Sequence, residues 1–218
     1  ALVWKNTEGI NVRPFYHQDE FENQFSPIPG HPKHWYIAQD VFIDDAAIAN
    51  KLALDAIEKG AEAIIFTLEK EFETSVVFKN FPFEKITVYF NFKFLSETFI
   101  LQLKQFLFLK KTSVFYNIDS IGNLARSGNW FHNLKQDREI IQHIIQSNPS
   151  DNILGIDCSL YQNAGANMVQ QLAYAIAHAN EYFNNFVSEI NSDTSLNEFQ
   201  MTFNLAVGSN YFFEIAKI

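Results

Sequence analysis

The sequence predicts an α/β fold of the (β/α)8-barrel type, incomplete, with about six βα units that follow an irregular N-terminal arm. Segments with strand character and segments with helical periodicity alternate six times along the chain, at intervals of roughly 25 to 45 residues. Successive strands separated by helices run parallel, because a parallel pair needs a long crossover connection. Residues 63–68 are continuously apolar, which is typical of a strand covered on both faces. An open doubly wound sheet satisfies the same alternation, so both architectures stay open on these grounds.

The arm is expected to comprise residues 1–34, where prolines and Gly30 interrupt a polar stretch. Residues 35–218 are expected to form the partial barrel. Their helical pattern runs to the end of the chain without a capping residue, and a complete barrel needs about 250 residues. We therefore expect a barrel truncated after its sixth strand.

The expected strands are rich in β-branched and aromatic residues and cover 35–41, 63–68, 86–92, 113–118, 152–157 and 200–207. The expected helices cover 46–59, 73–79, 96–109, 138–146 and 166–190, and a last one begins at 210. Asp44 or Asp45 can cap the first helix and Ser96 the third. Gly60 stands where a terminating glycine belongs. Asp137 is expected to open the fourth helix, and Asn163 to cap the fifth after a turn at Gly165.

The composition excludes several classes of protein. Of the 218 residues, 47% are hydrophobic and 19% are charged, which indicates a folded core. The net charge of −9 argues against nucleic-acid binding. No segment has the length of a membrane span or a signal peptide, so we expect a cytoplasmic protein with no membrane partner. A single cysteine, Cys158, excludes a disulfide framework and a cysteine-rich zinc site, and we expect no metal.

Acidic side chains stand at or near the carboxyl ends of three predicted strands: Asp40, Asp119 and Asp157. Binding sites of parallel barrels are built at that edge, although capping and loop hydrogen bonds explain acidic residues there equally well. Cys158 is expected to be a small buried filler, because no histidine is near it in sequence. His143 and His178 are expected to be surface or half-buried helix residues. The 23 phenylalanines suit either a wide sheet core or a partner interface.

Three segments, in order along the chain, resemble the methylmalonyl-CoA mutases. Residues 7–16 (TEGINVRPFY) resemble the family's T-x-E-G-I-x-V-x-P-x-Y arm. Residues 161–173 (YQNAGANMVQQLA) are similar to H-x-Q-E-A-G-A-x-x-V-Q-E-L-A, and residues 207–217 (VGSNYFFEIAK) to G-x-N-F-F-x-E-x-A-K-L-R. The positions that we carry forward as motif matches are Glu8, Gly9, Tyr161, Gln162, Asn163, Gly165, Thr202 and Asn210.

The chain also departs from that family at positions that matter for chemistry. The family's histidine falls on Leu160, which cannot donate a hydrogen bond to a thioester carbonyl. The family's R-x-S, which helps to hold CoA, falls on residues 200–202, so that Gln200 replaces the arginine. Only four residues separate Pro29-Gly30 from Trp35, where active mutases carry a long segment with a catalytic tyrosine. The D-x-H-x-x-G motif that holds adenosylcobalamin does not occur in the sequence.

The resemblance therefore implies the barrel part of a non-catalytic small subunit of methylmalonyl-CoA mutase. We expect no catalytic, cofactor-binding or metal-binding residue in this chain, weak or absent acyl-CoA binding, and a large catalytic subunit as heterodimer partner. That subunit would carry adenosylcobalamin and interconvert methylmalonyl-CoA and succinyl-CoA. The arm and the phenylalanine-rich faces are the expected subunit contacts, and we also hypothesise that aromatic side chains fill the barrel axis. The alternatives are an autonomous acyl-CoA-binding barrel, or an active acyl-CoA mutase of different specificity, which Leu160 opposes.

Overall fold

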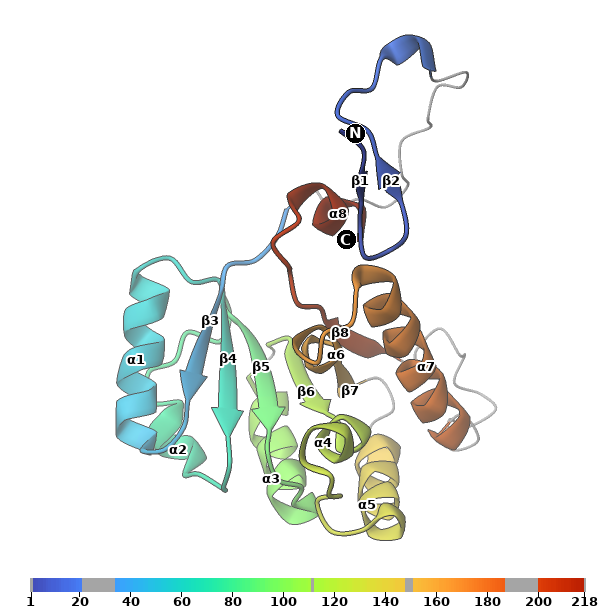
Figure 1. The fold of residues 1–218 in the computed structure, drawn as a ribbon. Coiled ribbons are helices and arrows are strands. Elements are labelled where there is room, and N and C mark those ends of the chain that lie inside the picture. The colour runs from blue at the N-terminus through green and yellow to red at the C-terminus, as the bar shows by residue number, and fades with distance from the viewer. Residues whose placement is uncertain (1, 21–33, 111, 148–150, 187–199, 218) are drawn as a thin grey trace.

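The computed structural model describes residues 2–20, 34–110, 112–147, 151–186 and 200–217. Within these ranges, six parallel strands form one curved sheet in the order of the sequence (Figure 1). The strands are β3 (Ala38–Phe42), β4 (Ala63–Leu68), β5 (Thr87–Phe92), β6 (Val114–Ile118), β7 (Asn152–Asp157) and β8 (Met201–Asn204). In a doubly wound sheet the strand order reverses at a switch point, whereas a barrel keeps the order of the chain. The sheet is therefore of the barrel type, and the described strands do not close it.

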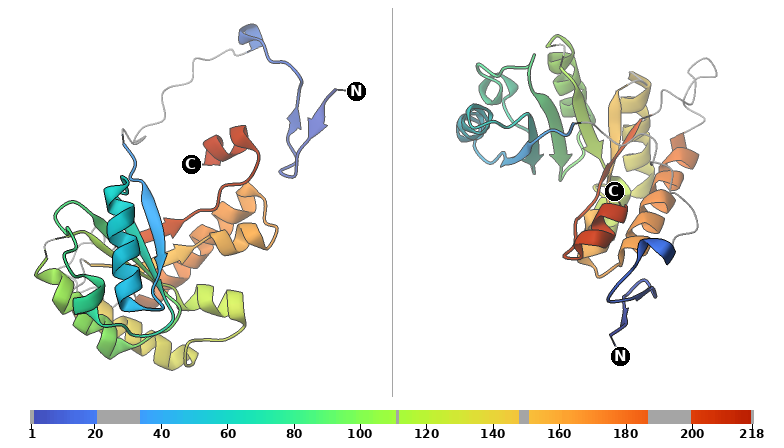
Figure 2. Two further views of the ribbon diagram at one scale, coloured as in Figure 1. Left: turned by 90° about the vertical axis from the view of Figure 1, so that its left-hand side faces the viewer. Right: turned by 90° about the horizontal axis from the view of Figure 1, so that it is seen from above.

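Helices follow the strands, and the longest of them lie along one side of the sheet (Figures 1 and 2). They are α1 (Ala46–Glu58), α2 (Thr74–Val77), α3 (Glu97–Phe108), α4 (Ser120–Ser127), α5 (Leu134–Ser147), α6 (Ser159–Asn163), α7 (Met168–Phe186) and α8 (Tyr211–Lys217). Asp45 caps α1 by accepting hydrogen bonds from the N–H groups of Ala47 and Ile48, and Ser96 caps α3. Gly60 follows α1 with a φ of 104°, a conformation that favours glycine. These three predictions are confirmed.

Two helices, α4 and α6, were not predicted from the sequence, and two helix starts differ from the prediction. Helix α5 begins at Leu134 rather than 138, because Asn133 accepts the N–H of Gln136 while Asp137 turns inward and accepts the N–H groups of Phe131 and His132.

The prediction that Asn163 caps the fifth helix is wrong. Asn163 is the last residue of α6 and is exposed. The helix that follows, α7, begins at Met168, where Asn167 accepts the N–H of Gln170. The turn at Gly165 is present, with a φ of 96°. The predicted end of this helix, 187–190, lies outside the described residues, and β8 ends at Asn204 rather than 207.

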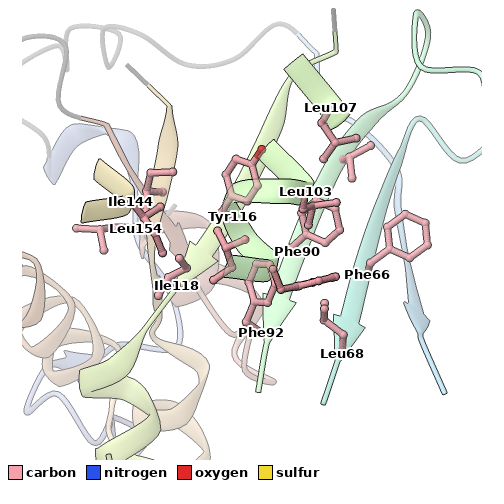
Figure 3. Close-up of a cluster of buried hydrophobic side chains, with 14 of the residues drawn as sticks. Phe66, Leu68, Phe90, Phe92, Leu103, Leu107, Tyr116, Ile118, Ile144 and Leu154 are labelled. Carbon is pink, nitrogen blue, oxygen red and sulfur yellow. The ribbon is translucent and has the colours of Figure 1, made fainter. Parts of the chain in front are cut away.

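The hydrophobic core lies between the sheet and the helices (Figure 3). Alternate strand residues point into it, such as Phe66, Leu68, Phe90 and Phe92, and Leu103 of α3 packs against them. Phenylalanine rings contact one another throughout this layer, so the interpretation of the aromatic surplus as a wide core is confirmed. The hypothesis that aromatic side chains fill the barrel axis stays a prediction, because the described strands do not close a barrel, and Tyr36, Tyr89 and Phe203 help to line the pocket on their other face.

The arm is more regular than predicted. Residues Trp4–Lys5 (β1) and Asn11–Val12 (β2) pair as an antiparallel hairpin, and Gln18–Glu20 form a 3-10 turn. Asn6 stabilises the hairpin loop by accepting the N–H of Ile10 at 2.7 Å, and Gly9 has a φ of 79° within that loop. No helix within the described residues is long and apolar enough to cross a membrane.

Candidate functional site

A pocket of about 410 Å3 opens on the concave side of the sheet, opposite the core. It is formed by the strand residues that alternate with those of the core, so that Ile65 and Tyr89 line the pocket while Phe66 and Phe90 are buried behind them. Ala38, Ala63 and Gly155 leave room at its floor. Its polar lining consists of Asp40, Asn91, Asn117, Asp119, Asn123, Arg126, Asp157, Thr202 and Asn204. The three aspartates predicted to share this edge of the sheet are thus brought together.

Asn117 enters the pocket from an irregular position of β6. The pairing of β6 with β7 shifts register between Phe115 and Ile118, and Asn117 has a φ of 46°. Asparagine tolerates this left-handed region better than most residues, and bulges of this kind re-aim a side chain. The Thr202 hydroxyl donates a hydrogen bond to Asn117 Oδ1. Strand β7 approaches Asn117 closely because Gly155 has no side chain. A Cβ at Gly155 would lie 2.7 Å from both Cα and Cβ of Asn117.

Gly155→Ala is therefore expected to lower the free energy of unfolding by roughly 1–3 kcal/mol. The new Cβ meets backbone, which no side-chain rotation can relieve. Denaturant unfolding of the full-length protein measures the effect. Gly208→Ala is the matched control, because its Cβ meets only the movable ends of Gln162 and Glu214, each at 2.9 Å. Equal losses at the two positions would contradict the close approach of β7 to Asn117.

Asp119 is the best-connected side chain at the pocket rim. Its Oδ1 accepts the N–H of Gly122 at 2.7 Å and the hydroxyl of Tyr182 at 2.8 Å. Its Oδ2 accepts the N–H of Asp157 at 3.1 Å. His178 Nε2 lies 3.0 Å from Oδ1, and the side chain of His178 is 1% exposed. One carboxylate therefore joins the ends of β6 and β7 to the buried face of α7.

Burial alone would raise the pKa of the Asp119 carboxyl, but His178 and the N–H groups of Gly122 and Asp157 outweigh it and lower that pKa. The unfolded chain consequently takes up the proton at a higher pH than the folded protein does. The stability that this group contributes is therefore fully present above about pH 4, the ordinary range of an aspartate, and is lost as the pH falls further through the lowered pKa.

We expect the free energy of unfolding of the full-length protein to fall more steeply below about pH 4 than that of the Asp119→Asn variant, which lacks this titrating group. Denaturant unfolding at a series of acidic pH values measures both slopes. Parallel curves would mean that Asp119 is not held as a carboxylate in the folded state.

The remaining charges at the rim are largely paired. Arg126 donates to Asp157 Oδ2 at 2.5 Å, while Asn204 and Ser159 donate to Asp157 Oδ1. Lys93 follows β5. Burial, and to a smaller extent the charge of Arg126, lower the pKa of its ammonium group, while the three rim aspartates act in the opposite direction. Cations and carboxylates at this rim therefore offset each other.

The hydroxyl and thiol groups near these charges are either buried or bound within the chain. Cys158 is fully buried, and burial raises the pKa of its thiol to about 11, so that it is a filler as predicted. The Ser159 hydroxyl donates to Asp157 Oδ1, and the same carboxylate accepts from Asn204 and Arg126. The pocket can hold and orient a ligand by hydrogen bonds.

The three sequence motifs meet at a second place, which we call the motif junction: residues 4–8 of the arm, 162–168 between α6 and α7, and 208–214 before and within α8. They line a pocket of about 370 Å3. Asn167 donates to the carbonyl of Thr7 at 3.2 Å, and Glu8 accepts the N–H of Met168 at the start of α7. The rings of Trp4 and Phe213 meet edge to face at 6.1 Å. Figure 1 shows the hairpin beside α8 and the first turn of α7.

The structure divides the motif matches between these places. Glu8, Gln162, Gly165 and Asn210 line the junction, and Thr202 lines the concave pocket. Leu160 is half-buried on α6, and Gln200 is exposed just before β8. The remaining matches are Gly9 in the hairpin loop, Tyr161, whose hydroxyl lies 3.1 Å from His178 Nδ1, and the exposed Asn163.

Sequence reasoning missed His178, Tyr182 and Arg126 of the site. It also missed the four asparagines of the pocket lining, which are Asn91, Asn117, Asn123 and Asn204. His178 is buried between Asp119 and Tyr161, contrary to the prediction of a surface or half-buried position. The spacing of Gln171, His178 and Tyr182 is a helical signal that one face of α7 is buried and polar. Arg126 belongs to α4, and the sequence holds no signal strong enough to predict that helix.

The sequential parallel sheet, with its pocket at the carboxyl ends of the strands, defines a protein of the α/β-barrel class. The family model for methylmalonyl-CoA mutase matches residues 67–218. The chain belongs to the methylmalonyl-CoA mutase family.

Two curated relatives carry the same family name. The chain is 25% identical over 243 residues to the methylmalonyl-CoA mutase small subunit of Porphyromonas gingivalis, a match that covers 99% of this chain and 38% of that protein. It is 33% identical over 82 residues to a methylmalonyl-CoA mutase of Cereibacter sphaeroides, which covers 37% of this chain and 11% of that protein. The chain thus spans well under half of the length of the relatives that it matches.

Proposed function

We propose that this chain is part of the non-catalytic small subunit of an adenosylcobalamin-dependent methylmalonyl-CoA mutase. In this proposal a large catalytic subunit interconverts methylmalonyl-CoA and succinyl-CoA, and the present chain supports it as the other half of a heterodimer. The name of the Porphyromonas gingivalis relative supports the choice of subunit.

The observation that carries the proposal is the loss of substrate-binding groups from the barrel. The family's histidine position holds the apolar Leu160, and the family's arginine position holds the neutral, exposed Gln200. The cation that lines the concave pocket, Arg126, is already paired with Asp157. Three aspartates line the same pocket, which disfavours the phosphates of CoA.

The residues present do not fit adenosylcobalamin either. A cobalt ligand needs a histidine nitrogen that is free to coordinate. Among the described residues, His178 contacts the rim aspartate Asp119, and its two nitrogens lie 3.0 Å from Asp119 and 3.1 Å from the Tyr161 hydroxyl. The sequence also lacks D-x-H-x-x-G. We therefore assign the cofactor, which supplies the radical when bound, to the large subunit, and no step of the reaction to this chain.

The arm is our candidate for the subunit contact. A two-stranded hairpin is marginally stable by itself, and this one is held at the motif junction by few contacts. Its Val3, Trp4 and Ile10 side chains are about half exposed. Large apolar side chains on such a projecting hairpin suit burial against a partner.

The proposal is tested by turnover. The full-length small subunit, supplied with adenosylcobalamin and methylmalonyl-CoA, is expected to form no succinyl-CoA until the large subunit is added. Turnover by the small subunit alone would support the alternative of an active mutase with relocated catalytic groups.

The other alternative, an acyl-CoA-binding module, is favoured by the open concave pocket. Calorimetry of the full-length small subunit with succinyl-CoA separates the two, because our proposal predicts weak or absent binding. Tight binding that is lost when Arg126 is replaced by alanine would favour the module instead.

A further inference from the structure

Two of the three aspartates that line the concave pocket, and its arginine, are already engaged by groups of the chain. Asp157 receives Arg126, Asn204 and Ser159, as described above. Asp119 is engaged by Tyr182, His178 and two backbone N–H groups. A ligand at this part of the pocket therefore finds Asp119, Asp157 and Arg126 already partnered.

Hydrogen-bonding groups without a full set of partners remain in the same pocket. Asn117 uses its Oδ1 to accept the Thr202 hydroxyl, which leaves its Nδ2 as a donor. Asn91, from the neighbouring strand β5, lines the pocket and has no hydrogen bond from its side chain within the described part of the chain. Asp40, from β3, is a carboxylate that accepts the Thr67 hydroxyl with Oδ1 and retains Oδ2 as an acceptor. Strands β3, β5 and β6 thus contribute both donors and acceptors to the pocket.

One wall of the pocket is aromatic. Tyr89 lines it, and its ring stacks on that of Phe115 with the centroids 4.6 Å apart and the planes at 11°. Burial raises the pKa of the Tyr89 hydroxyl, which therefore stays protonated and neutral at physiological pH. The stack gives a rigid apolar surface beside the open amides.

We propose that the concave pocket binds a small, uncharged, polyhydroxylated ring, of the class of cyclic polyols and free pentoses. A hydroxyl group both donates and accepts, as the mixed lining of Asn91, Asn117 and Asp40 requires. The C–H face of such a ring suits the ring of Tyr89, which lines the pocket and is held in place by its stack on Phe115. The pocket volume of about 410 Å3 is many times the roughly 30 Å3 that one water occupies in the liquid. The pocket therefore has room for such a ring together with several waters. This inference goes beyond the proposed function and does not depend on it.

The test uses the full-length small subunit, free and in complex with the large subunit, with myo-inositol and D-ribose as probes. We expect saturation-transfer NMR to show transfer from the aromatic protons of the protein to the ring protons of at least one probe. Asn91→Ala is expected to weaken binding roughly fivefold, the effect of one lost hydrogen bond. Asn117→Gly, which the left-handed backbone tolerates, is expected to do the same.

Asn180→Ala, an exposed position on α7, is the matched control and is expected to leave binding unchanged. The proposal is overturned if neither probe binds at tens of millimolar, or if binding survives both pocket variants unchanged. It is also overturned if succinyl-CoA occupies the pocket in preference to both probes. Association with the large subunit is scored separately, so that its failure would count against the proposed function and not against this inference.

Discussion

Replacing Asp119 by alanine is expected to lower the free energy of unfolding by about 3–5 kcal/mol. The substitution removes the acceptor of the Gly122 and Asp157 N–H groups and of the Tyr182 hydroxyl. It also leaves the buried His178 Nε2 without the carboxylate oxygen that lies 3.0 Å from it. Each loss adds a desolvated group without a partner. Denaturant unfolding of the full-length protein, followed by circular dichroism, measures the change.

The matched control is Asp55→Ala. Asp55 also pairs with a cation, Lys59, at 2.7 Å, but both side chains are more than half exposed. Such an exposed pair contributes little to stability, because solvent screens it. If Asp119→Ala cost no more than this control, the contacts of Asp119 would not hold the ends of β6 and β7 to α7 as we infer.

The second large effect is expected in the aromatic layer of the core. Phe90 is fully buried, and its ring lies within about 6.4 Å of the rings of Phe66, Phe78 and Tyr116. Phe90→Ala removes these contacts and leaves a cavity behind the centre of the sheet, at a cost of about 3–5 kcal/mol. Thermal or denaturant unfolding measures it.

Phe108→Ala provides the comparison for Phe90→Ala. Phe108 ends helix α3 and is 77% exposed, so its truncation is expected to change stability by no more than about 0.5 kcal/mol. Similar losses for the two variants would contradict the placement of the aromatic core on the helical side of the sheet.

The elements with strong local signals were predictable from the sequence. Strands 63–68 and 152–157 were predicted with the bounds that the structure has, because each is a short apolar run next to a polar or glycine-containing turn. The caps at Asp45 and Ser96 were predictable because a side-chain acceptor precedes each helical pattern.

Short helices at the rim were not predictable. Helix α4 spans only Ser120–Ser127 and contains Gly122, so its apolar pattern of Ile121 and Leu124 is too short to predict a helix. Contacts with other residues fix the position of α4. Asp119 accepts the N–H of Gly122 at its start, and the Tyr182 hydroxyl accepts the N–H of Ile121. Tertiary contacts of this kind override local propensity.

The acidic edge of the site was predictable, but its connections were not. Parallel strands place their carboxyl ends together, which is why Asp40, Asp119 and Asp157 meet. Which groups neutralise them depends on packing between distant segments. His178 lies 59 positions after Asp119, and no spacing rule joins them. The meeting of the arm with α7 at Glu8 and Met168 is likewise visible only in three dimensions.

These observations fit a barrel that keeps the architecture of its family while its carboxyl-end rim serves a different purpose. Asp119, Asp157 and Arg126 at the rim are partnered within the chain. In our proposal, the substrate-binding positions of the family fall on Leu160 and Gln200. The three family motifs nevertheless meet at one junction. Under our proposal, that junction is retained because it positions the arm for a partner.

Analytical ultracentrifugation of the full-length small subunit mixed with the large catalytic subunit tests this account most directly. At micromolar concentration the account predicts one boundary whose mass is the sum of one small and one large subunit, with the mutase activity sedimenting in it. Two separate boundaries, with full activity in the large subunit alone, would contradict it.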